Sequence, residues 1–321
     1  MNRQKFTRRE IFAPTGTAIT AAMIGGLSNA SHAAPRQDKP SNKQAFRYCL
    51  NTGTIRGQKL GLLKEIEVVA KAGYDAIEPW IDSIRNYEKQ GGSLKDLKKK
   101  ISDLGLTVES AIGFSQWVVD DDAKRAKGME NIKQDMDILA QIGGKRIAAP
   151  PAGATNQPGL DLLKAAERYR ELLDLGDQMG VVAQIETWGP SKNLYRLGQA
   201  AYVAIESGHP KACILADVYH LYKGGSDFNG LKLLRGSAMQ VFHMNDYPAD
   251  PPRESIGDKD RVYPGDGIAP LTQILRDLFA TGPGKILSLE IFNRTYWAQD
   301  ALKTATDGLR KMKDAVHKAL G

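Results

Sequence analysis

The most constraining feature of the sequence is an alternation of short apolar runs with longer amphipathic stretches, which begins at residue 45 and continues nearly to the C-terminus. Short apolar runs predict buried strands, and stretches with apolar residues at helical spacing predict helices that cover them. Strands that alternate with helices favour a parallel sheet. The expected strands are residues 45–50, 74–78, 106–112, 145–149, 181–186, 212–217, 238–243 and 285–290.

Glycines mark the ends of the helical stretches. Gly73, Gly105, Gly143 and Gly180 each follow one, at the position where a helix commonly stops, and a strand begins soon afterwards. Eight such units predict an α/β fold of one domain, the closed (β/α)8 or TIM barrel. An open doubly wound sheet is the alternative, but no glycine-rich phosphate loop follows the first strand. The expected helices are residues 57–72, 93–104, 122–142, 159–179, 193–207, 228–235, 267–280 and 299–318.

The N-terminus has the pattern of an export signal. Residues 7–12 (TRREIF) contain paired arginines, a weakly apolar stretch follows, and residues 31–33 (SHA) offer the small residues that a signal peptidase reads. We therefore expect residues 1–34 to be a twin-arginine signal peptide, residues 35–44 a linker, and residues 45–321 the barrel. The expected location is periplasmic or otherwise extracytoplasmic. A disordered basic N-terminus is the alternative.

The positive charge of the chain comes largely from this signal. Arg3, Lys5, Arg8 and Arg9 against Glu10 account for +3 of the formal net charge of +7. The remainder contains no basic tract interleaved with aromatic residues, so we expect no nucleic-acid partner. Neither the apolar part of the signal nor any other segment is long and apolar enough to predict a membrane span.

The two cysteines, Cys49 and Cys213, fall on the first and sixth expected strands. These strands are not neighbours in an eight-stranded barrel, so the sulfur atoms should lie too far apart for a disulfide. We expect two buried free thiols.

Carboxylate and imidazole side chains lie at the C-terminal ends of four successive expected strands. These strands end in Glu186, Asp217, His243 and Glu290. In this type of barrel the C-terminal rim carries the active site. Three carboxylates at one rim would repel one another, and one divalent ion would remove that cost. The oxygen and imidazole ligands suit Mn²⁺, our first expectation, or Co²⁺, Fe²⁺, Mg²⁺ or Zn²⁺. Taken singly, each residue has a structural alternative, such as capping a helix or packing in the core.

Five short motifs resemble those of the xylose-isomerase-like barrels. That group includes ketose 3-epimerases, hydroxypyruvate isomerases, and inosose isomerases and dehydratases. The resemblance covers about residues 45–318, and residues 260–265 (DRVYPG) are most similar to the inosose-isomerase branch. The motifs are residues 185–186 (IE), 217–220 (DVYH), 242–246 (FHMND), 264–267 (PGDG) and 289–290 (LE).

The resemblance implies roles for these residues. Glu186, Asp217, His243 and Glu290 would hold one metal ion, Glu186 and Glu290 would also be the catalytic acid and base, and His220 would touch the substrate. A metal bound to a carbonyl and the adjacent hydroxyl of a ketose, inosose or keto-sugar would acidify the carbon between them. Proton transfer there gives epimerisation or isomerisation, and loss of a β-hydroxyl gives a lyase or dehydratase reaction.

Four further residues are candidates for substrate binding. Glu78 ends the second strand and would reach a substrate hydroxyl or form a structural salt bridge. Trp117 and Trp188 would wall a sugar pocket or pack in surface loops. Arg261 would bind an anionic or polyol group or brace its loop.

Other functions stay open to different degrees. Endonuclease IV shares the barrel, but its histidine-rich three-metal site has no counterpart here. Asp246, Asp258 and Asp260 leave open a second metal. Residues 244–248 (MNDYP) differ from the turn of the ketose epimerases, which leaves room for a lyase. A non-catalytic exported sugar-binding barrel is the remaining class. The expected partner is a sugar or polyol, and the resemblance allows a homo-oligomer.

Overall fold

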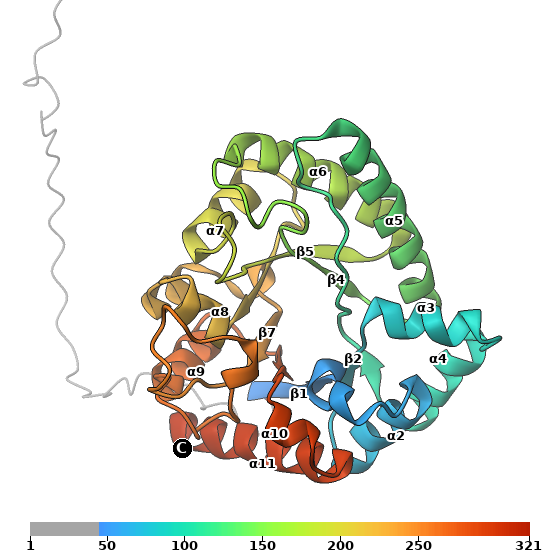
Figure 1. Ribbon diagram of the computed structural model, residues 1–321, viewed down its shortest axis with the longest axis vertical. Coiled ribbons are helices and arrows are strands. Elements are labelled where there is room, and N and C mark those ends of the chain that lie inside the picture. Colours follow the sequence, from blue (N-terminus) through green and yellow to red (C-terminus); the bar gives the residue numbers. More distant parts are fainter. Residues whose placement is uncertain (1–44) are drawn as a thin grey trace, which may run out of the picture. The chain divides into compact units, whose positions relative to one another are not determined.

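A parallel eight-stranded sheet forms the centre of the computed structural model, which describes residues 45–321. The strand order is β3-β2-β1-β8-β7-β6-β5-β4, and every paired neighbour is parallel. Figure 1 shows the strands enclosed by a ring of helices. The strands are β1 (Phe46–Asn51), β2 (Ala76–Glu78), β3 (Thr107–Val108), β4 (Arg146–Ala149), β5 (Val182–Glu186), β6 (Ile214–Asp217), β7 (Val241–Met244) and β8 (Lys285–Leu289).

The sheet closes through the chain that follows β3. This strand is shorter than the expected 106–112, but Ala111 continues alongside β4. Its N–H donates to the Arg146 carbonyl at 3.1 Å, and its carbonyl accepts from the Ala148 N–H at 2.9 Å. These bonds join the two ends of the strand order, and the predicted TIM barrel is confirmed.

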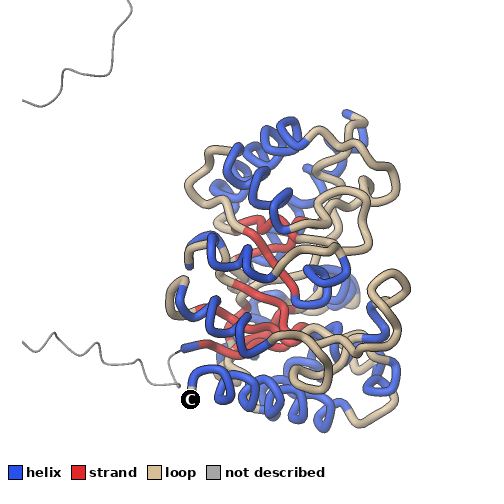
Figure 2. Tube along the Cα trace, turned by 90° about the vertical axis from the view of Figure 1, so that its left-hand side faces the viewer, coloured by secondary structure: helices blue, strands red, loops and turns tan. Residues whose placement is uncertain are grey.

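Helices cover the outside of the barrel, and Figure 2 shows them flanking the strands. Gly73 and Gly180 cap α2 and α6 in the left-handed conformation, with φ of 90° and 71°, as their sequence positions predicted. The α-helices are α2 (Leu62–Ala72), α3 (Ile81–Lys89), α4 (Leu94–Asp103), α5 (Asp122–Gln141), α6 (Leu162–Met179), α7 (Leu197–Glu206), α8 (Val218–Lys223), α9 (Leu271–Ala280), α10 (Arg294–Trp297) and α11 (Ala301–Leu320).

Two helical regions differ from the expectation. The stretch 228–235 forms a 3₁₀ helix, η2 (Phe228–Leu233), rather than an α-helix, and Asn229 and Gly230 within it have low α-helical propensity. The short α8 follows β6 directly instead. An additional helix, α3, precedes α4. The other 3₁₀ helices are η1 (Thr52–Gln58), η3 (Gly236–Ala238) and η4 (Asp258–Asp260).

Apolar side chains fill both faces of the sheet. One cluster lies between strands and helices, and a smaller one joins strands from around the barrel, including Cys49, Ala148 and Ile286. Both Cys49 and Cys213 are buried free thiols, which confirms the prediction.

The predicted signal (1–34) and linker (35–44) lie outside the described residues. In the part of the chain that the structure describes, no helix combines the length and apolar character needed to cross a membrane.

Candidate metal centre and active site

The four predicted metal ligands meet at the C-terminal ends of their strands. Glu186 ends β5, Asp217 ends β6, His243 lies in β7, and Glu290 follows β8 directly. Strand pairing sets Asp217 beside His243, and none of the four residues is more than 3% exposed. His243 Nδ1 lies 3.2 Å from Glu290 Oε2 and 3.8 Å from Asp217 Oδ2. The barrel therefore brings Asp217, His243 and Glu290 together, and Glu186 lies with Glu290 in the wall of one cavity.

His243 is held by a carboxylate on its far side. Its Nε2 lies 3.0 Å from Glu78 Oε2, which also accepts from Asn51 Nδ2 at 3.0 Å and from Ser288 Oγ at 2.7 Å. Nδ1 is buried and has no hydrogen-bond partner within residues 45–321. Burial lowers the pKa of His243, but Glu290 and Glu78 outweigh burial and raise it well above its usual value. A proton on Nδ1 would occupy the place that a metal ion would take.

The two glutamates at the centre differ in charge. Burial and the neighbouring Glu290 raise the pKa of Glu186 to about 8, and its Oε2 is another buried atom without a partner in the described chain. Burial acts in the same direction on Glu290, but His243 and Arg261 outweigh it and lower the pKa of Glu290 below its usual range. In the absence of a metal ion, Glu186 therefore holds a proton more tightly than Glu290 does.

Arg261 supplies a positive charge inside the centre. The side chain is buried, and its Nη1 lies 2.8 Å from Glu290 Oε2 and 3.1 Å from Asp217 Oδ2. Its Nη2 contacts Asp258 Oδ1 at 2.5 Å and His220 Nε2 at 3.1 Å. The guanidinium therefore bridges two of the predicted ligands instead of only bracing its loop.

A second combination of side chains can also hold an ion. Asp217, His220 and Glu290 offer ligand atoms that all lie within 4.8 Å of one another. His220 Nδ1, however, accepts the Gly189 N–H at 3.3 Å, and its Nε2 faces Arg261. Because His243 has an unoccupied nitrogen and an oriented ring, we consider it the better ligand, and the donor set fits a divalent cation.

A cavity of about 420 Å³ opens above these residues. Glu186, Glu290, His220 and Arg261 form part of its wall, together with Trp188 as the sequence suggested. A molecule bound in this cavity can therefore contact Glu186, Glu290 and the Arg261 guanidinium at once.

Aromatic side chains of this cavity were missed by the sequence analysis. Trp80 and Phe292 line it together with Trp188. Each lies two residues after a glutamate at or just after a strand end, and residues two apart along an extended chain face the same way. An aromatic residue two positions after a strand-end glutamate is the signal that would have found them.

Two predicted substrate contacts lie elsewhere. Trp117 is fully buried, donates from Nε1 to the Pro150 carbonyl at 2.9 Å and packs against Tyr169, so it belongs to the core. Glu78 is also fully buried and lies behind His243, away from the cavity wall. It forms with His243 the ion pair that was the alternative, and its role as a substrate contact stays a prediction.

The acidic residues considered for a second metal are already engaged. The carboxylate of Asp246 accepts the backbone N–H groups of Tyr247, Gly265, Gly267 and Ala269, which fixes the turn at 264–267. Asp258 binds Arg261, as described above. Asp260 accepts the Gly257 N–H at 2.9 Å.

Comparison with known proteins identifies the family. A model of the xylose isomerase-like TIM barrel matches residues 66–315. The chain belongs to this family. An inosose isomerase from Bacillus velezensis is 26% identical over 82% of this chain and 95% of its own length. A 3-dehydroshikimate dehydratase from Pseudomonas aeruginosa is 25% identical over 78% of this chain but only 39% of its own length.

A solved structure of the IOLI protein with a bound zinc atom has the same fold as this xylose isomerase-like barrel. The TM-score is 0.77 at 22% identity, and the match covers 85% of this chain and 99% of that one.

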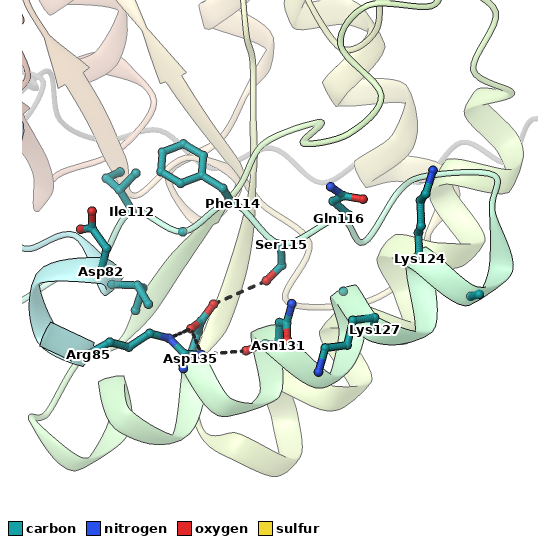
Figure 3. Close-up of a pocket in the computed structure, with 14 residues that line it drawn as sticks. Asp82, Arg85, Ile112, Phe114, Ser115, Gln116, Lys124, Lys127, Asn131 and Asp135 are labelled. Carbon is teal, nitrogen blue, oxygen red and sulfur yellow. Dashed lines mark hydrogen bonds and ion pairs between the residues drawn. The ribbon is translucent and has the colours of Figure 1, made fainter. Parts of the chain in front are cut away.

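A second and larger cavity adjoins the first in this xylose isomerase-like barrel. It has a volume of about 740 Å³ and lies between α3, α5 and the loop after β3. Figure 3 shows Arg85 paired with Asp135 in its wall, and Lys124 and Lys127 of α5 also line it. Ile112 and Phe114 line both cavities, so the two adjoin at these side chains.

Proposed function

We propose that this chain is a divalent-metal-dependent sugar isomerase or epimerase that acts on a ketose, inosose or keto-sugar. The observation that carries the proposal is a pair of buried atoms, His243 Nδ1 and Glu186 Oε2, that make no hydrogen bond within residues 45–321. His243 Nδ1 lies beside Asp217 and Glu290. Buried polar atoms without partners are rare and call for a ligand. Mn²⁺ is the ion we propose, with Co²⁺, Fe²⁺, Mg²⁺ and Zn²⁺ as alternatives, and zinc occupies the similar IOLI protein.

The side chains of the site then have separate roles in proton transfer and substrate binding. When bound, the ion polarises a carbonyl and its adjacent hydroxyl and so acidifies the carbon between them. Glu186 and Glu290 line the same cavity, so one of them can accept a proton from that carbon and the other can return one. Arg261 and His220 line the same cavity and can bind the substrate hydroxyls.

A dehydratase is the second candidate reaction. It is favoured by the similarity to a 3-dehydroshikimate dehydratase. The same base would remove the proton, and a hydroxyl β to the carbonyl would leave with the proton of the acid.

The space beside the centre favours a substrate larger than one sugar ring. Because Phe114 and Ile112 line both cavities, a glycoside with its keto ring at Glu186 and Glu290 can extend towards Lys124. Phe114 is 45% exposed, and its ring lies 5.9 Å from that of Trp188, which provides an apolar surface for sugar rings.

The test combines metal content with proton exchange. The chain from Ala34 onwards is purified with the variant Glu290→Gln, and with Glu206→Gln on the exposed end of α7 as a matched control. We expect wild type and control to bind one divalent ion per chain and to exchange solvent deuterium into a ketose, inosose or 3-keto-glycoside. The Glu290 variant should lose both.

The outcomes separate the candidate functions. Formation of water-eliminated product identifies the dehydratase. Bound metal and bound sugar without exchange or product would favour a sugar-binding barrel. Absence of metal from wild type, even after refilling with Mn²⁺, would overturn the proposal.

A further inference from the structure

A basic cavity lies at the opposite end of the barrel from the candidate metal centre. Its volume is about 380 Å³, and residues at the N-terminal ends of β1, β4 and β8 line it. Arg47 lies in β1, Arg146 begins β4 and Lys285 begins β8, with Lys145 adjacent to Arg146. Four cationic side chains therefore surround one cavity.

Glu109 is the acidic residue in this wall, and three of the cations already share it. Arg47 Nη1 lies 2.6 Å from Glu109 Oε1, Lys145 Nζ 2.8 Å from the same oxygen, and Arg146 Nη1 3.3 Å from Oε2. Burial raises the pKa of Glu109, but the hydrogen bonds from Lys145, Arg47 and Thr107 outweigh burial and lower it to about 2. The carboxylate is therefore ionised, and the cluster still has an excess of positive charge.

Lys285, the fourth cation, is not among the residues that pair with Glu109 in the described chain. Its side chain is 2% exposed, and its Nζ makes no hydrogen bond and no ion pair within residues 45–321. Nζ lies next to Gly236, which is another residue of the cavity wall. A Cβ atom added to Gly236 would be 3.5 Å from Nζ. Burial lowers the pKa of Lys285. A buried ammonium without a partner is costly, and a bound anion would remove the cost.

We propose that this cavity binds a small tetrahedral oxyanion of the phosphate or sulfate type. Such an anion would accept a hydrogen bond from Lys285 and would be attracted by the guanidinium groups of Arg47 and Arg146, which line the same cavity. The half-exposed side chains of Arg47 and Lys145 mark where it enters. Bound there, the anion would bridge β4 and the strands β1 and β8, which pair with each other, at the mouth of the barrel. The site requires neither the metal centre nor turnover.

The test measures thermal stability against oxyanion concentration. Wild type is titrated with phosphate and, in parallel arms, with sulfate, with acetate and with a sugar phosphate, each at the ionic strength of a sodium chloride reference. A ligand that binds the folded state raises Tm saturably. We expect phosphate and sulfate to raise Tm by about 2–4 °C, the shift that roughly 1 kcal/mol produces in a domain of this size class. A larger rise of Tm with the sugar phosphate than with phosphate would show that the anion bound in the cavity is a phosphoryl group carried on a larger molecule.

Two matched lysine variants make the result specific. Lys285→Met should lose the oxyanion response and, without phosphate, be at least as stable as wild type, because an uncompensated buried charge is gone. Lys133→Met, on the exposed face of α5, should keep the response. General salting-out by phosphate or sulfate affects all three proteins equally and is thereby subtracted.

Two results would overturn the proposal: a chloride response equal to the phosphate response, or a phosphate response that survives in Lys285→Met. If Lys285→Met fails to fold, Lys145→Gln at the half-exposed rim gives the same decision. Its phosphate midpoint should rise, and an unchanged midpoint would contradict the site.

Discussion

At the scale of single residues, the orientation of one imidazole ring decides whether the centre can hold a metal. Glu78 binds His243 Nε2 and is itself fixed by Asn51 and Ser288. A carboxylate that accepts the outer N–H of a histidine fixes its tautomer and strengthens it as a ligand. Glu78 therefore acts on the centre through His243.

Replacing Glu78 tests this role. In Glu78→Gln the amide oxygen can still accept a hydrogen bond, but the charge that supports His243 is lost. We expect Mn²⁺ or Zn²⁺ affinity to fall by about 10–100-fold, the usual effect of losing such a partner. Competition with a chelator of known affinity measures it. Glu88→Gln, exposed on α3, is the control, and equal affinities in the two variants would contradict the role.

The sequence predicted the residues of the centre better than their partners. Strand-end positions placed Glu186, Asp217 and Glu290 together because barrel topology alone brings strand ends to one rim. The position of Trp117 depends on how a loop packs, and no local pattern encodes that. Arg261 belongs to a long connection after β7, so its contact with Asp217 could be found only in the folded chain.

At the scale of elements, helix α2 contains a carboxyl group that is poorly matched to its surroundings. Glu65 is buried, and its Oε2 has no hydrogen-bond partner in the described chain. Burial, opposed by Arg56 and assisted by Asp82, raises the pKa of Glu65 to about 7. The folded chain thus binds this proton more tightly than the unfolded chain does.

A pH-dependent stability follows. Below the pKa that Glu65 has in the unfolded chain, the protonated carboxyl does not destabilise the folded chain. As the pH rises above that value and through about 7, the carboxyl must ionise while buried, and the free energy of unfolding falls. Glu65→Gln removes the penalty, so its stability relative to wild type should increase by about 2–3 kcal/mol between acidic and alkaline pH. Urea unfolding at about pH 4 and about pH 8.5 measures the difference.

The same helix offers the control. Glu67 is exposed, and its hydrogen bond with Lys100 lowers its pKa, so Glu67→Gln should gain nothing at alkaline pH. A Glu65→Gln variant with the same pH dependence as wild type would show that Glu65 is not the responsible group.

Elements with strong periodicity were predicted well, and irregular ones were not. The four glycines that end helical stretches all have positive φ, so their positions predicted α2, α4, α5 and α6 correctly. The stretch 228–235 has helical spacing, but only a 3₁₀ helix, η2, forms there. Strand β3 is short because pairing of the following residues with β4 depends on closure of the whole barrel.

At the scale of the whole molecule, the barrel separates its chemistry from a neighbouring space that can accept part of a substrate. The polar second cavity and the aromatic first cavity share Phe114. On the proposed function, the two together fit a glycoside.

Filling the second cavity tests the size of the substrate. Asn131 lines this space from α5, and Asn131→Trp should obstruct it without touching the metal centre. We expect kcat/KM for a keto-glycoside to fall about tenfold or more, the effect of losing roughly 1.4 kcal/mol of contact energy, while the free keto-sugar is unaffected. Lys133→Trp on the outer face is the control. Equal losses on both substrates would contradict an extended site.

Arg261 has a consequence for the order in which the chain folds and binds its metal ion. Because its guanidinium bridges Asp217 and Glu290, the chain carries its own counter-ion at the place where acidic groups crowd. A positive charge that is part of the chain offsets the repulsion between these carboxylates without any ion, so the barrel can fold before a metal binds.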